Sequence, residues 1–165
     1  MKTTLDINEP GLNVLPPGVE RHVVNGGGLT AFQIFPDDEI EIVNEEGNQI
    51  CEIICFNKDG ESEVGILNLK ENSDKNFIRD ILNGKDETIL ATNYQLKKRN
   101  LNITQSKSSI VFDKDTPPGE KIKLKSKDKC YAIFSAPGED MLVTNQNPPS
   151  ELTIFITRAK IINDK

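Results

Sequence analysis

The sequence predicts a mainly β protein, either a β-sandwich or a distorted barrel of two pseudo-repeated halves, with a short two-helix insertion around residues 73–100. Two observations favour this class. Short apolar segments follow one another on both sides of the insertion, separated by turns rich in Gly, Pro, Asn and Asp. A helical period of apolar residues occurs only in the middle of the chain. We therefore expect a loosely ordered lead-in over residues 1–15 and a single β-rich domain over residues 16–165.

The first half contains about four short strands in about 40 residues, a spacing typical of sandwiches and barrels. We expect the strands at residues 19–24, 29–35, 39–43 and 49–57. The third strand alternates, with Ile40 and Ile42 on one face and Glu39 and Glu41 on the other. The turns are NGGG, whose glycines allow positive φ, PDDE and NEEGN.

The insertion has the pattern of two helices. The first is expected to begin with Ser73 as its N-cap and to stop at Gly84. The second has Asp86 as its N-cap, Glu87 in its first turn and basic residues in its last turn, where they suit the helix dipole. The apolar stripes of the two helices are expected to be Phe77, Ile78, Ile81 and Leu82, and Ile89, Leu90, Asn93 and Leu96.

Strands return after the insertion, at residues 109–112, 120–127, 130–138 and 151–159. The segment TPPGEKIKL echoes LPPGVERHV of the first half, which indicates a duplicated β fold. This part of the chain also has a lysine at every second position, which is typical of a solvated edge strand that resists edge-to-edge pairing. A basic ladder for a polyanion is the alternative for these residues, Lys121, Lys123, Lys125, Lys127 and Lys129.

Composition argues against several classes of partner. The formal net charge is −6 and the chain has no Trp and two Tyr, so neither phosphate neutralisation nor base stacking is favoured, and we expect no nucleic-acid partner. No run approaches the ~20 apolar residues of a membrane span, and the N-terminus lacks the apolar stretch of a signal peptide. We expect a cytoplasmic protein without a membrane partner, whose three cysteines are free thiols.

The strand at residues 49–57 carries two cysteines, Cys51 and Cys55. Their separation on a strand places the Cα atoms ~13 Å apart on one face, too far for a disulfide or a shared zinc ion. With Ile53, they are expected to pack in the core. His22 is the only histidine of the chain, and we expect it at a half-buried or surface position on the first strand.

Glu52 falls on the opposite face of the same strand, together with Ile50, Ile54 and Phe56. A carboxylate among apolar neighbours is unfavourable unless it is paired or hydrogen-bonded. Two interpretations remain open. Either this face is partly solvated, or Glu52 lines a cavity and binds a cationic or amide-like ligand or acts as an acid/base group, with Gln49 beside it.

Two longer patterns point to a family: PPG…RHVVNGGGLTAFQIFPDDEIEIVNEEGNQICEIICFN and DKDTPPGE…FSAPGEDM…NPPSELTIFITRA. With them the chain resembles, over roughly residues 14–160, the urea-carboxylase-associated family, which has a Gly-x-Gln strand followed by an acid. It is most similar to the subset in which this domain precedes a glycine-cleavage T-protein-like aminomethyltransferase module. The matching residues are Gly47, Gln49, Glu52, Ala136, Pro137, Gly138, Met141, Pro148 and Pro149.

The resemblance implies a non-catalytic accessory or ligand-binding β domain, associated with a folate-dependent aminomethyltransferase in one-carbon or amine metabolism. Its partner would be that module or a small amine ligand, tetrahydrofolate would bind only through the module, and a homo-oligomer is possible. No metal is expected, since the His-Asp pair and the Cys of the family's hydrolase-like members have no counterpart in the second half, which has Cys130 and no His. The candidate ligand-binding residues are Gln49, Glu52, Arg21, His22, Met141 and Asn145.

Two alternatives remain. One is a small metal-dependent amidine or amide hydrolase, with Glu52 as the acid/base group and His22, Cys51 or Cys130 on the metal. The other is a cupin-like small-molecule-binding protein, which the β-rich pattern favours and the single histidine disfavours.

Overall fold

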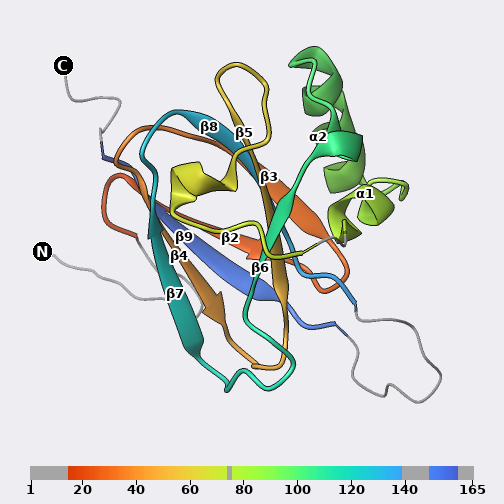
Figure 1. Ribbon diagram of the computed structural model, residues 1–165. Coiled ribbons are helices and arrows are strands. Elements are labelled where there is room, and N and C mark those ends of the chain that lie inside the picture. The colour runs from red at the N-terminus through yellow and green to blue at the C-terminus, as the bar shows by residue number, and fades with distance from the viewer. Residues whose placement is uncertain (1–14, 74–75, 139–148, 160–165) are drawn as a thin grey trace, which may run out of the picture.

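The computed structural model describes residues 15–73, 76–138 and 149–159. Two four-stranded antiparallel sheets lie face to face, so the fold is the sandwich rather than the barrel (Figure 1). The first sheet has the order β2 (Val19–Val24), β9 (Leu152–Thr157), β4 (Glu39–Asn44) and β7 (Glu120–Lys125). The second has the order β3 (Leu29–Ile34), β8 (Cys130–Ser135), β5 (Cys51–Asn57) and β6 (Ser108–Val111).

The strand order agrees with the repeat in the sequence. β2 and β7, which follow the two Pro-Pro-Gly segments, are the two edge strands of the first sheet, and β4 and β9 are its adjacent central strands. Exchanging β2 with β7 and β4 with β9 gives the same strand order, read from the opposite edge of the sheet. Gly18 and Gly119, at the entrances of the two edge strands, have φ of 82° and 81°, which glycine adopts without a steric penalty.

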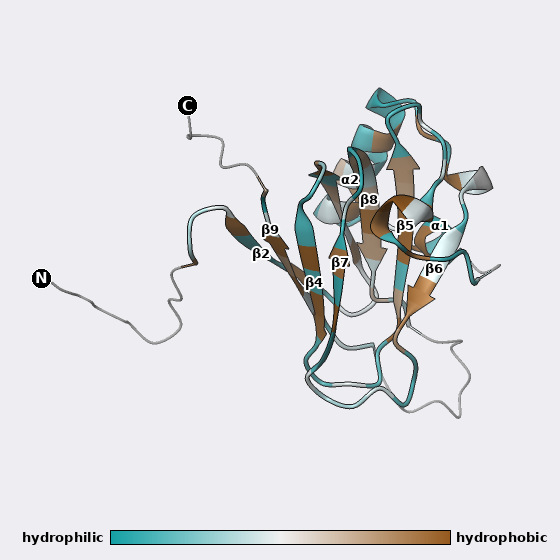
Figure 2. Cartoon of the chain, turned by 60° about the vertical axis from the view of Figure 1, so that its left-hand side comes forward, coloured by the Kyte–Doolittle hydropathy of each residue, from teal (hydrophilic) through white to brown (hydrophobic). Residues whose placement is uncertain are grey.

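The main core lies between the sheets and contains apolar side chains of both. Figure 2 shows apolar segments on strands of both sheets. From β5, this core contains Cys51, Ile53 and Cys55, as predicted, and all three are fully buried. Phe134 of β8 and Ile154 of β9 lie in the same cluster. These buried side chains form the contact between the two sheets.

A second core covers the outer face of the second sheet. There Ile54 and Phe56 of β5 and Ile133 of β8 pack against α1 (Phe77–Ile81) and α2 (Glu87–Lys98). Both faces of β5 and β8 are therefore covered, which explains why these strands are apolar along their length instead of alternating. The expectation that the second face of β5 is partly solvated is wrong, because the helical insertion packs on it.

The helices differ from the prediction in two details. α1 begins after Asn76, whose side chain accepts a hydrogen bond from the N–H of Arg79, and not after Ser73. In α2, Asp86 caps the N-terminus as predicted, by accepting from the N–H of Ile89. Leu90, however, is 55% exposed. The 3₁₀ turns η1 (Val64–Leu67) and η2 (Ile103–Gln105) complete the described elements.

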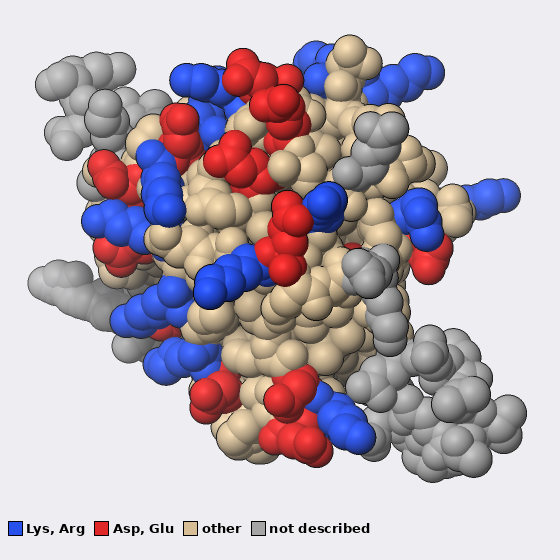
Figure 3. Space-filling model, in the orientation of Figure 1, with Lys and Arg blue, Asp and Glu red and all other residues tan. Residues whose placement is uncertain are grey.

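β7 is the edge strand that its lysines predict, since among the described strands it pairs with β4 alone. The side chains of Lys121, Lys123 and Lys125 are exposed. Figure 3 shows basic side chains gathered along this edge, while acidic and basic side chains are mixed over the rest of the same face.

None of the helices within the described ranges has the length and apolar content that a membrane span needs.

Candidate functional site

The six predicted ligand-binding residues are not brought together by the described part of the fold. Arg21 and His22 lie next to each other on β2, at the edge of the first sheet, with Arg21 exposed. The ring of His22 packs on Phe32 at a centroid distance of 4.3 Å, as a half-buried histidine would. Met141 and Asn145 lie outside the described residues.

His22 also borders a charged network that the sequence did not reveal. Its Nε2 lies 3.0 Å from Glu20, which accepts two further hydrogen bonds from Arg158. Nη1 of Arg158 donates to Asp38 over 2.8 Å, and the side chain of Asp38 is only 2% exposed. The Arg158 guanidinium lowers the pKa of Glu20, its hydrogen bond being the largest cause. The network joins the end of β9 to β2 and to the β3–β4 turn.

Gln49 connects three segments of backbone instead of facing open space. Its Nε2 donates to the carbonyls of Ile50 and Pro137, each over 2.8 Å, and its Oε1 accepts from the N–H of Ser150 over 2.9 Å. The residue is 4% exposed. Gln49 thereby holds the start of β5 to the segments that follow β8 and precede β9, so these three side-chain hydrogen bonds stabilise the fold.

Glu52 is fully buried and holds α1 on the sheet. Its Oε1 accepts from the N–H of Ile78 over 2.7 Å and its Oε2 from the N–H of Phe77 over 3.1 Å. The Ser108 hydroxyl donates to Oε2 over 3.3 Å. Burial raises the pKa of Glu52, and these hydrogen bonds oppose the rise only in part. Both carboxylate oxygens thus bind the chain itself, and the ligand-binding role of Glu52 stays a prediction.

The three cysteines are free and buried, as expected. Burial raises the pKa of Cys51. The Cys55 thiol donates to the sulfur of Cys130, which raises the pKa of Cys55 and lowers that of Cys130. In the part of the chain that the structure describes, no group of three or more His, Cys, Asp or Glu side chains could hold a metal ion, so the ligand set of the hydrolase alternative is not assembled there.

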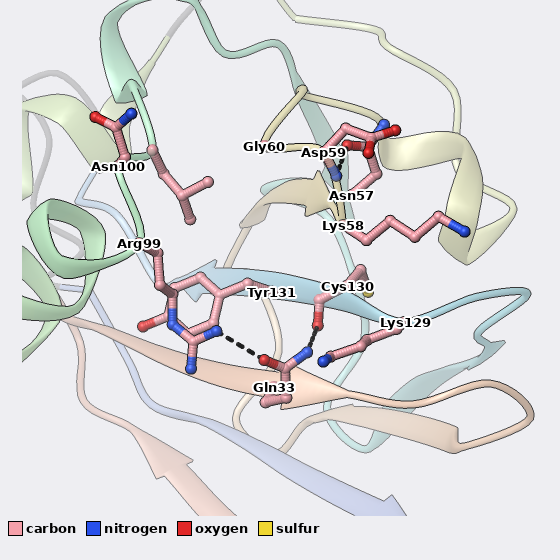
Figure 4. Close-up of a pocket in the computed structure, with 11 residues that line it drawn as sticks. Gln33, Asn57, Lys58, Asp59, Gly60, Arg99, Asn100, Lys129, Cys130 and Tyr131 are labelled. Carbon is pink, nitrogen blue, oxygen red and sulfur yellow. Dashed lines mark hydrogen bonds between the residues drawn. The ribbon is translucent and has the colours of Figure 1, made fainter.

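A cleft of about 370 Å³ lies where α2 ends over the second sheet (Figure 4). We call it the Arg99 cleft. One side is formed by residues 99–101, which follow α2, and another by the turn at residues 57–60, after β5. The remaining lining residues are Gln33 of β3, Lys129, and Cys130 and Tyr131 of β8.

Arg99 is held in place by its neighbours in the cleft. Its Nη1 donates to Oε1 of Gln33 over 2.8 Å, and its Cζ lies 4.6 Å from the centre of the Tyr131 ring. Gln33 in turn donates to the carbonyl of Cys130 over 2.9 Å, and Figure 4 shows Gln33 between Arg99 and Lys129. Such stacking and pairing restrict a side chain that is otherwise flexible.

No local pattern in the sequence predicts this cleft. Arg99 belongs to the basic residues that suit the end of a helix, and Lys129 belongs to the lysine run at residues 121–129. The partners Gln33 and Arg99 are 66 residues apart in the chain. Only the packing of α2 over β3 and β8 places these side chains in one cleft.

No family model matches the chain, but its sequence is similar to that of a characterised enzyme. Over 153 residues, or 93% of this chain, the sequence is 31% identical to trimethylamine-oxide aldolase from Ruegeria pomeroyi. The chain spans only 19% of the length of that relative. Among solved structures, a DUF1989 family protein from Silicibacter pomeroyi aligns with 90% of this chain and 82% of its own, at 10% identity and a TM-score of 0.48. That likeness is too weak to support a functional argument.

Proposed function

We propose that this chain is an accessory β domain of amine metabolism that works with a folate-dependent, aminomethyltransferase-like catalytic module. The observation that carries the proposal is the match of 93% of the chain to one segment, 19% in length, of trimethylamine-oxide aldolase. The remaining 81% of the relative (100% minus 19%) has room for a separate catalytic module. The motif resemblance to domains that precede T-protein-like modules supports the same arrangement.

The position of the motif residues is consistent with an accessory domain. Gly47, Gln49 and Glu52 carry the resemblance, and in this fold each has a structural task. Gly47 has φ of +76°, and a Cβ there would lie 2.7 Å from the nitrogen of Pro118. Gln49 and Glu52 use their side chains to hold loops and α1 to the sheets. The shared motif therefore maintains the fold of the domain and does not depend on which ligand or partner the domain binds.

Two measurements test the proposal. The first is co-purification of the tagged chain with an aminomethyltransferase-like protein expressed with it. The second is calorimetric titration of the chain with trimethylamine oxide and trimethylamine. We expect a stable complex with the protein or saturable binding of one of the amines. Failure of both would overturn the proposal.

The predicted site residues are tested in the same titrations. Arg21 is exposed on β2, so Arg21→Gln changes its charge without affecting the core. Arg79→Gln is the matched control, because Arg79 is equally exposed but lies on α1. Weaker binding of trimethylamine oxide, whose oxygen can accept a hydrogen bond from a guanidinium, by Arg21→Gln alone supports the predicted site. Equal binding by the two variants argues against a role for Arg21.

A further inference from the structure

We propose that the Arg99 cleft binds the carboxylate group of a small organic acid, with Arg99 and Lys129 as the residues that contact it. The volume of about 370 Å³ lies within the range of small-molecule sites. The inference rests on the charge and geometry of the cleft and is independent of the function proposed above.

The first argument is charge. The cleft gathers Lys58, Arg99 and Lys129, contributed by three separate segments of the chain, against one carboxylate, Asp59. This occurs in a protein whose formal net charge is −6. A concave site lined by one sign of charge attracts ligands of the opposite sign. The cleft therefore favours an anion over a cationic amine.

The second argument is that the guanidinium of Arg99 is already oriented before a planar ligand binds. A guanidinium has five N–H donors, of which Nη1 uses one on Gln33 and Nε one on Gln95, over 3.4 Å. Within the described residues, the three other donors have no hydrogen-bond acceptor. The plane of the group is fixed by Gln33 and by the Tyr131 ring. A fixed, planar donor group matches the two oxygens of a carboxylate.

The third argument is the surroundings of the guanidinium. Tyr131 is 7% exposed, and burial raises the pKa of its hydroxyl group. On the other side, the turn at residues 57–60 is kept in shape by Asn57, whose Oδ1 accepts from the N–H of Asp59 and of Glu61. A ligand would thus meet a largely pre-formed site, which lowers the entropy lost on binding.

The test is an NMR titration of ¹⁵N-labelled protein with acetate, succinate and glycine, and in parallel with inorganic phosphate and trimethylamine. We expect saturable shifts for at least one carboxylate, located at the side-chain amide of Gln33 and at residues 57–60 and 99–101. Arg99→Gln should weaken the binding by about tenfold or more, as expected for loss of hydrogen bonds to a charged group. Lys129→Gln removes an exposed cation of the cleft and should weaken the binding by about two- to fivefold.

The control is Lys98→Gln, which removes the same charge one residue earlier, at an exposed position outside the cleft. Unchanged binding by this variant supports the proposal. Equal weakening by Lys98→Gln, shifts that do not saturate, or binding of phosphate without binding of any carboxylate would overturn it. If Arg99→Gln fails to fold, as judged by circular dichroism, Lys129→Gln alone decides, and unchanged carboxylate binding by it overturns the proposal.

Discussion

The buried carboxylate of Glu52 gives the sharpest prediction for stability. In Glu52→Gln, an NH₂ group replaces one of the two oxygens that accept from the N–H groups of Phe77 and Ile78. One of these N–H groups then faces a donor. An unsatisfied buried donor costs about 1–3 kcal/mol. We therefore expect the variant to be less stable by this amount below about pH 4.5, where the raised pKa keeps the native carboxyl group protonated.

The pH dependence follows from the direction of the pKa change. Burial raises the pKa of Glu52 above its ordinary value of 4.5, so the folded state binds more protons than the unfolded state between 4.5 and the raised pKa. Stability from this group is present at low pH and declines as pH rises through that window, by up to about 1.4 kcal/mol per pH unit. Gln does not titrate, so the stability difference between the native protein and the variant should narrow as pH rises from 4.5 through the raised pKa of Glu52.

The assay is urea unfolding at constant ionic strength from about pH 4 to about pH 8, which covers the window above 4.5. Unfolding is followed by far-UV circular dichroism, since the chain has no Trp for fluorescence. Glu39→Gln is the matched control, because it makes the same chemical change at an exposed position of β4 and should leave the pH profile unchanged. A stability difference for Glu52→Gln that stays constant, or widens toward pH 7, would refute the argument. It would mean that the hydrogen bonds from α1 outweigh the burial of the charge.

Two further predictions concern the stability of the sandwich, through the ion pair of Asp38 with Arg158 and the backbone conformation of Gly47. Asp38→Ala should lower the free energy of unfolding by about 3 kcal/mol or more, because it leaves the half-buried Arg158 without its most buried acid. Denaturant unfolding measures this, and a loss below about 1 kcal/mol would show that Glu20 alone compensates. Gly47→Ala should lose at least about 2 kcal/mol, since a Cβ there meets backbone at 2.7 Å and φ is +76°. Gly119→Ala, with φ of +81° but open space around its Cβ, should lose only about 1 kcal/mol, and an equal loss at both positions would contradict the steric argument.

Most of the secondary structure followed from local signals. The turns at residues 25–28, 36–39 and 44–48 and the alternation of Ile40 and Ile42 were sufficient to place β2 to β5, and Asp86 was sufficient to begin α2. The start of α1 was not, because Ser73 and Asn76 are both good N-caps. The long-range contact that fixes the start of α1 is Glu52, which lies 26 residues before Ile78 in the chain.

The functional residues were harder to predict than the strands. Gln49 and Glu52 are predicted to bind a ligand, but a sequence motif does not show whether a polar atom faces a ligand or the chain itself. The structure shows that their side chains bind backbone N–H and carbonyl groups. The Arg99 cleft lacks any local signature, since its residues come from four separate stretches of the chain.

The sequence by itself determined the mainly β class, the two-helix insertion, the lysine-rich edge strand and the core position of Cys51 and Cys55. These depend on the period of side chains along the chain and on turn residues, which act over a few positions. Only the tertiary structure decided that the helices cover the outer face of β5, that Glu52 is buried beneath α1, and that Arg99 and Lys129 share a cleft. Those outcomes depend on which apolar faces pack together, and that packing is set by the whole chain at once.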